Sequence, residues 1–284
     1  MKALKRLATH HPVVFSLLIT LIVLIFYIAA GVLAEILAQD EVSYQLTEAF
    51  GRLATSTFFL YILWRFGWLK PAGITNFGSF RAWAVMLMIL VYETVFTVYF
   101  FFGDFALNIS DPKLSVSVGL NSMSTGFIEE LPFRGIILYT FVRLWGDSRR
   151  GLLKGVLYSS LLFGGSHLIH LLFGRPLPQA TLVAVSTFLS GIYLAALVLH
   201  WRSIWAAVAF HGLSNTIIAI KVIETPGFTE TVPALSLFIL VQLPVVVYGL
   251  FLIYRQQLQP AVHTINARSS TPANTLSLED QQGG

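Results

Sequence analysis

Several side chains that can carry a charge or exchange a proton stand inside long apolar stretches of this sequence. Glu129, Glu130 and Arg134 lie in one stretch, His167 in a second and His211 in a third. Ionisable groups inside apolar segments are costly, and they usually face a cavity or a partner group. Carboxylates, imidazoles and a guanidinium are also the groups that activate water and stabilise charge in hydrolysis. We therefore expect these residues to meet in one site.

The spacing within the first stretch gives its two carboxyl groups different surroundings. Glu130 and Arg134 are four residues apart and share a helix face, so Arg134 can neutralise Glu130. Glu129 is rotated by about 100° on a helix of 3.6 residues per turn and has no cation on its own face. An unpaired carboxyl in apolar surroundings suits a general base. Pro132 removes a backbone donor and is expected to kink the segment, which opens room for water.

The two histidines have useful neighbours at helical spacing. His211 and Asn215 share a face, where their two donors can hold the oxyanion of a tetrahedral intermediate. The Phe163 ring can pack beside the His167 imidazole and limit its rotamers, while the small residues at 164–166 let another helix approach. One carboxylate, two imidazoles and one amide from three segments predict a hydrolytic site.

The elements that position these groups are expected to be membrane-spanning helices. Of the 284 residues, 56% are hydrophobic and only 11% are charged, whereas soluble domains carry about 25% charged residues. A span needs about 20 mostly apolar residues. The sequence therefore predicts an all-α polytopic membrane protein with about eight transmembrane helices. The predicted spans are residues 12–34, 49–69, 82–103, 119–142, 152–173, 181–200, 203–223 and 233–254.

Basic residues indicate the orientation of these spans. With both termini in the cytoplasm, most Lys and Arg residues fall in cytoplasmic segments, as the positive-inside rule requires. The outer segments then hold only Arg52, Lys113, Arg175 and Lys221. The first apolar run is longer than the roughly 7–15 residues of a signal peptide, which favours a retained anchor over cleavage near residues 29–31.

Three features fall outside the predicted site. The polar segment from Gln256 to Gly284 has no periodicity and is expected to be disordered. Glu93 stands alone in another predicted span, where a structural role is the favoured interpretation. The chain has no cysteine, which excludes disulfides and thiolate chemistry.

Three short motifs resemble those of one family. Residues 129–135, Glu-Glu-Leu-Pro-Phe-Arg-Gly, resemble the EExxxR motif of the type II CAAX prenyl endopeptidase and bacteriocin-processing superfamily, also called Abi or CPBP. Residues 163–167 resemble its FxxxH motif, and residues 211–215 resemble its HxxxN motif. The motifs occur in the family's order, each inside an apolar segment, and the resemblance covers about residues 119–223.

The resemblance implies an intramembrane glutamic endopeptidase. The site is expected to need no metal and no cofactor, because its donors already account for the residues. In that family the first glutamate and the second-motif histidine activate water, while the second glutamate and the arginine support the site. The third-motif histidine and asparagine stabilise the oxyanion. The candidate catalytic residues are therefore Glu129, His167, His211 and Asn215, with Glu130, Arg134 and Phe163 in supporting positions.

The expected organisation and partners follow from these interpretations. Residues 1–118 are expected to form about three N-terminal spans, 119–223 the catalytic core, 224–255 the last span and 256–284 the polar tail. The expected substrate is a membrane protein or a lipidated or hydrophobic peptide in the lipid bilayer, most simply the plasma membrane of a bacterium. Nucleic acid is not an expected partner, because the basic residues cluster at the ends of apolar runs.

Three other functions remain compatible with these residues. A zinc hydrolase would use Glu129, His167 and His211 as ligands with an open fourth position, although the sequence has no H-E-x-x-H helix. A proton-coupled transporter would use the same groups as a relay, although such folds often show inverted repeats and none is visible here. The third alternative is a non-catalytic membrane scaffold or a bacteriocin self-immunity protein, a type that the resembling family also contains.

Overall fold

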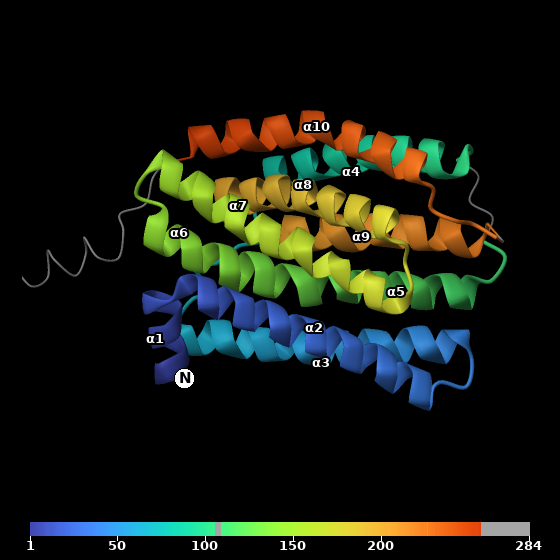
Figure 1. Ribbon diagram of the computed structural model, residues 1–284, viewed down its shortest axis with the longest axis horizontal. Helices are drawn as coiled ribbons and strands as arrows, with labels where there is room; N and C mark the ends of the chain where they lie inside the picture. Colours follow the sequence, from blue (N-terminus) through green and yellow to red (C-terminus); the bar gives the residue numbers. More distant parts are fainter. Residues whose placement is uncertain (106–108, 226, 257–284) are drawn as a thin grey trace, which may run out of the picture.

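A computed structural model describes residues 1–105, 109–225 and 227–256, and these residues form a bundle of helices (Figure 1). The tail predicted to be disordered lies, from residue 257 on, outside the described residues. The helices, in chain order, are α1 (Lys2–His10), α2 (Pro12–Leu37), α3 (Glu41–Phe66), α4 (Phe80–Phe102), α5 (Pro112–Glu130), η1 (Leu131–Leu138), α6 (Tyr139–Trp145), α7 (Arg149–Ser166), η2 (His167–Phe173), α8 (Leu177–Trp201), α9 (Trp205–Ile223) and α10 (Val232–Arg255).

Successive long segments run in opposite directions along the bundle, with α5, η1 and α6 forming one continuous segment and α7 continuing into η2. The amino terminus, the turn between α6 and α7 and the end of α10 lie at one end, called here the terminal end (Figure 1). The turn between α2 and α3 and the connection between α9 and α10 lie at the opposite, distal end.

The prediction of an all-α polytopic membrane protein is confirmed. Within the part of the chain that the structure describes, six segments are long and apolar enough to cross a membrane, namely α2, α4, α7 with η2, α8, α9 and α10. Large apolar side chains stand exposed on the outside of the bundle, among them Leu21, Ile36 and Leu172 at 53%, 71% and 79% exposure. Such a surface suits lipid rather than water. The two remaining predicted spans correspond to α3 and to α5–η1–α6, so the total of about eight spans stays a prediction.

The helix that contains the second predicted span begins before that span. Helix α3 begins at Glu41, well before residue 49, because Asp40 and Ser43 form a reciprocal cap: the Asp40 side chain accepts from the Ser43 backbone N–H, and Ser43 Oγ accepts from the Asp40 N–H. Arg52, predicted in an outer segment, is therefore inside α3 and only 5% exposed. Lys221 is also buried, in α9, with Nζ 2.9 Å from Asp104. A hydropathy count assigns such charged residues to segments outside the spans, because it scores each residue alone and takes no account of an ion pair or hydrogen bond with a distant residue.

Two glycines allow the helices that carry the site to approach closely. A Cβ atom at Gly126 of α5 would lie 2.6 Å from the Val208 carbonyl oxygen of α9. A Cβ at Gly164 of α7 would lie 2.6 Å from the Ala184 carbonyl oxygen of α8. The predicted close approach at residues 164–166 is therefore made by Gly164, whereas Gly165 faces open space. Small residues of this kind let helix backbones meet where no side chain separates them.

The helix changes pitch directly after the paired glutamates. Residues Leu131–Leu138 form a π-helix between α5 and α6, and Pro132 lies at its start. Proline has no N–H to donate and its ring crowds the preceding turn, so a wider turn relieves both conflicts. The predicted distortion at Pro132 is thus a change of pitch. Ser159 of α7 donates to the Phe133 carbonyl oxygen at 3.1 Å, which ties this wide turn to the helix that leads to His167.

Candidate active site

Glu130 is held on both sides at the centre of the bundle. Its side chain is fully buried, with Oε2 3.1 Å from Arg134 Nε and Oε1 2.9 Å from His211 Nδ1. The contact with Arg134 is the one that the four-residue spacing predicted, and it forms although the helix is widened there. Arg134 is 2% exposed, and its guanidinium carbon lies 4.0 Å from the centre of the Phe163 ring. Glu130 therefore acts as a fixed buried anion that joins α5 to α9.

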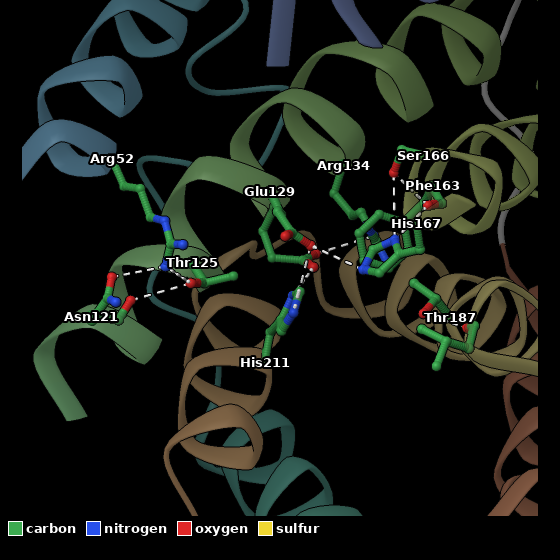
Figure 2. Close-up of polar contacts among 12 residues, drawn as sticks. Arg52, Asn121, Thr125, Glu129, Arg134, Phe163, Ser166, His167, Thr187 and His211 are labelled. Atoms are coloured by element: carbon green, nitrogen blue, oxygen red, sulfur yellow. Dashed lines mark hydrogen bonds and ion pairs between the residues drawn. The ribbon is translucent and has the colours of Figure 1, made fainter. Parts of the chain in front are cut away.

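Glu129 lies beside this pair and faces both histidines (Figure 2). Its Oε2 atom is 4.0 Å from His167 Nε2 and 3.7 Å from His211 Nε2. Both distances exceed those of direct hydrogen bonds, and Oε2 has no hydrogen-bond partner among the described residues. The three groups come from α5, η2 and α9, so the predicted convergence of the three motifs is present in the fold.

The backbone around His167 decides which ring nitrogen faces Glu129. At His167 the α-helix α7 tightens into the 3₁₀-helix η2, and the His167 N–H bonds to the carbonyls of Gly164 and Gly165. The Phe163 carbonyl, the usual helical acceptor for that N–H, is left to accept from His167 Nδ1 at 3.0 Å. A carbonyl only accepts, so Nδ1 carries the proton, and a neutral ring then presents a bare Nε2 to Glu129.

His211 has a carboxylate near each of its ring nitrogens. Nδ1 donates to Glu130 at 2.9 Å, and Nε2 lies 3.7 Å from Glu129. With His211 as an imidazolium, the cluster of Glu129, Glu130, Arg134 and His211 has no net charge. With a neutral His211 the same cluster carries one uncompensated negative charge in a buried site, which is costly. The geometry therefore favours a cationic His211.

Phe163 packs against several members of the site. Its ring meets the His167 imidazole at 5.2 Å and the His211 imidazole at 5.9 Å, edge to face in both cases. The predicted packing of Phe163 on His167 is thus present, and the contact with His211 is additional. Asn215 lies one turn beyond His211 on α9 and lines the same cavity as Glu129. All seven sequence-predicted residues are therefore at the site or on its wall.

A cavity of about 580 Å³ leads from the site toward the distal end. Near the site it is lined by Glu129, His167 and Asn215, and at its far end by Arg175 and Glu230. The last two form an ion pair of 3.2 Å between the loops that precede α8 and α10. A second hollow of about 40 Å³ reaches Glu129 and His167 from the side of α2. The site is thus open to a ligand of considerable size.

A buried polar network on the cavity wall was missed by the sequence reasoning. Arg52 bonds to Asn121 Oδ1 at 2.8 Å and to Thr125 Oγ1 at 2.7 Å (Figure 2). It also bonds to Glu48 at 2.5 Å. Tyr27 lies under the guanidinium, with its ring centre 4.4 Å away. The network joins α3 to α5 beside the site. Its signal in the sequence is two pairs at four-residue spacing, Glu48 with Arg52 and Asn121 with Thr125.

The zinc alternative requires a compact group of ligands. Across the described residues, no group of three or more His, Cys, Asp or Glu side chains has an arrangement that could hold a metal ion. Glu129, His167 and His211 do not form such a group.

Comparison with known proteins identifies the segment that carries the site. Residues 111–217 match the family described as type II CAAX prenyl endopeptidase Rce1-like. No curated protein and no solved structure matches the chain. The matched residues include every candidate site residue, from Glu129 on α5 to Asn215 on α9. The segment that holds the whole site therefore matches the Rce1-like family of type II CAAX prenyl endopeptidases, the family that its three motifs resemble.

Proposed function

We propose that this protein is an intramembrane endopeptidase in which Glu129 is the general base for water attack on a peptide bond. The observation that carries the proposal is the approach of two imidazole Nε2 atoms to the same carboxylate oxygen, at 3.7 and 4.0 Å. A water placed between Glu129 and His167 donates one hydrogen to each, because both groups accept there. Such a water is oriented for attack before the substrate arrives.

The reaction then needs one proton to move twice. Glu129 takes a proton from the water as the water oxygen bonds to the substrate carbonyl carbon. The tetrahedral intermediate that forms carries a negative charge on the former carbonyl oxygen. When the carbon–nitrogen bond breaks, Glu129 returns the proton to the departing amine, and the second product keeps the water oxygen in its new carboxyl group.

The developing oxyanion lies nearest to the groups on α9. A cationic His211 donates from Nε2, and the Asn215 amide supplies a second donor from the same face of the helix. Glu130 holds the His211 ring through Nδ1 at 2.9 Å and is itself fixed by Arg134. Because these donors are partly buried within the bundle, each is worth more than it would be in water.

The substrate that fits this site is an extended segment of a membrane protein or a lipidated or hydrophobic peptide. The cavity runs along the bundle within the apolar helices and reaches the distal end. With both termini in the cytoplasm of a bacterial cell, as the basic residues favour, that end faces away from the cytoplasm. We infer that the substrate reaches Glu129 from the outer side of the plasma membrane.

The test is cleavage of a panel of fluorescently labelled membrane peptides by the purified full chain in detergent. Wild type is compared with Glu129→Gln and His167→Ala, each with and without exhaustive chelation. Glu35→Gln is the matched control, because Glu35 is an exposed glutamate of α2. We expect cleavage by wild type and by Glu35→Gln, a loss of roughly 10²–10⁴-fold in the rate with Glu129→Gln, and no effect of chelator.

Each remaining outcome contradicts part of the proposal. Cleavage that is lost with chelator and restored by zinc would assign the site to metal chemistry. Cleavage that survives Glu129→Gln would remove the general base. Wild type that cleaves no peptide of a panel covering lipidated, propeptide-like and single-span sequences would favour a non-catalytic membrane protein.

A further inference from the structure

A second acidic side chain, separate from the proposed catalytic glutamate, lines the cavity. Glu93 lies in α4, is 3% exposed and lines the same cavity as Glu129. Its Oε2 atom accepts a hydrogen bond from the Tyr193 hydroxyl at 3.0 Å. Its Oε1 atom has no hydrogen-bond partner among the described residues. A structural tie would use the whole carboxyl group, whereas here one oxygen is left unused at the wall of a cavity.

Glu93 also differs from the other acids of the cavity in lacking a basic partner. Glu230 is paired with Arg175 at 3.2 Å, and Glu129 faces two imidazoles. No ion pair joins Glu93 to a basic side chain in the described part of the chain. An acidic side chain inside a membrane helix normally pairs with another charged or polar group. The lack of a basic partner for Glu93 among the described residues therefore indicates a site for a ligand.

The neighbouring polar groups bond to one another and leave this oxygen free. Ser186 donates to Gln242 Oε1 at 3.0 Å, and Gln242 Nε2 donates to Ser190 Oγ at 2.8 Å. Thr97 donates to the Glu93 backbone carbonyl at 2.6 Å. Among the described side chains of the wall between α4, α8 and α10, the Oε1 atom of Glu93 is therefore the buried carboxylate oxygen that no donor reaches.

We propose that Glu93 and Tyr193 form a subsite for a basic side chain, lysine or arginine, of the peptide substrate. The inference rests on the proposed peptidase function for the peptide nature of the ligand. A cationic group supplies the charge and the donor that Glu93 lacks. The Tyr193 ring packs on Phe210 at 5.5 Å, directly before His211, so the subsite adjoins the catalytic groups.

The depth of Glu93 favours a side chain over a lipid headgroup as the source of the cation. Glu93 stands nine residues before the end of α4 at Phe102 and farther from its start. At 1.5 Å per residue, that places it about 14 Å from the nearer end of the helix. The amine of a lipid headgroup stays at the membrane surface, whereas a peptide that reaches Glu129 carries its side chains to this depth.

The first test measures binding without catalysis. The full chain carrying Glu129→Gln is titrated with fluorescein-labelled leucine–alanine decapeptides, each with one lysine at a different position, and with the same peptides carrying norleucine instead. We expect at least one lysine peptide to bind about tenfold or more tightly than its norleucine partner. Adding Glu93→Gln should abolish that difference. Adding Glu230→Gln, which changes an acid already paired with Arg175, should preserve it.

The second test uses the active chain, so that the two proposals can fail separately. Cleavage of the preferred lysine peptide by Glu93→Gln should fall about tenfold or more in kcat/KM, while cleavage of the norleucine peptide stays unchanged. Equal affinity for every lysine and norleucine pair, or a lysine preference that survives Glu93→Gln, would overturn the subsite. If the wild-type chain cleaves no peptide but binding still shows a lysine preference that depends on Glu93, the peptidase proposal would be overturned and the subsite would stand.

Discussion

Glu130 and His211 are joined by a buried contact of 2.9 Å between the carboxylate Oε1 and the imidazole Nδ1 atoms. The two residues are 81 positions apart in the chain and lie on α5 and α9. Because Arg134 holds the other oxygen of the same carboxylate, the orientation of His211 depends on a charge that is fixed elsewhere. The supporting pair thus positions a proposed catalytic group, and changes to that pair should affect both stability and rate.

Arg134→Met should destabilise the fold strongly. The substitution leaves Glu130 buried without its guanidinium, and breaking a buried pair in this way costs about 3–5 kcal/mol. The measurement is the free energy of unfolding in mixed micelles, with Arg150→Met as the control because Arg150 is exposed. The double change Glu130→Gln with Arg134→Met should cost less than the two single costs added together, since it leaves no unpaired charge. A loss below about 1 kcal/mol for Arg134→Met would contradict a buried ion pair of this kind.

Asn215→Ala should slow turnover without loosening the fold. Removing one oxyanion donor costs roughly 10²–10³-fold in kcat, and KM should stay unchanged because the donor acts on the intermediate. The measurement is steady-state cleavage together with thermal unfolding. Ser214→Ala is the neighbouring control, since Ser214 also lines the cavity but is not expected to donate to the oxyanion. Normal turnover in Asn215→Ala would refute the assigned role.

Gly164→Ala and Gly165→Ala should have opposite effects although the residues are adjacent. The added methyl at Gly164 meets the Ala184 carbonyl oxygen at 2.6 Å and Phe188 Cβ at 2.7 Å, so α7 must move away from α8 and carry His167 with it. Overpacking of this kind costs about 1–3 kcal/mol, and cleavage should fall as well. At Gly165 nothing lies within 4 Å, and alanine should stabilise the helix by about 0.5–1 kcal/mol. Paired unfolding and cleavage measurements distinguish the two, and equal effects would contradict the packing of α7 on α8.

Phe163→Leu should lower the rate of cleavage by more than its loss of stability alone would cause. The ring lies 4.0 Å from the Arg134 guanidinium and meets both imidazoles. Leucine retains apolar volume but loses the cation–π contact, worth about 2 kcal/mol in buried surroundings. Phe141→Leu is the matched control, because Phe141 is fully buried and stacks on Trp145. Both variants should lose stability, and only Phe163→Leu should lose cleavage at temperatures where both remain folded.

The sequence by itself determined the class of the fold and singled out the candidate site residues. Twenty-residue apolar runs can bury their backbone polar groups only as helices, so the length of the runs predicted an all-α membrane protein. Charged and imidazole side chains are expensive in such runs, so Glu129, His167 and His211 were conspicuous without any coordinates. The pairing of Glu130 with Arg134 followed from helical spacing alone, because it is a contact within one turn.

The tertiary structure decided which groups meet across helices and which are left without partners. Arg52 was predicted in an outer segment, because its partners Asn121 and Thr125 belong to a helix about seventy residues later. The tautomer of His167 depends on where α7 tightens into η2, and the contact of His211 with Glu130 depends on the approach of α9 at Gly126. The open oxygen of Glu93 is likewise visible only when every neighbouring donor is located. Long-range packing sets these relationships, and a local pattern along the chain carries no record of the distance between two helices.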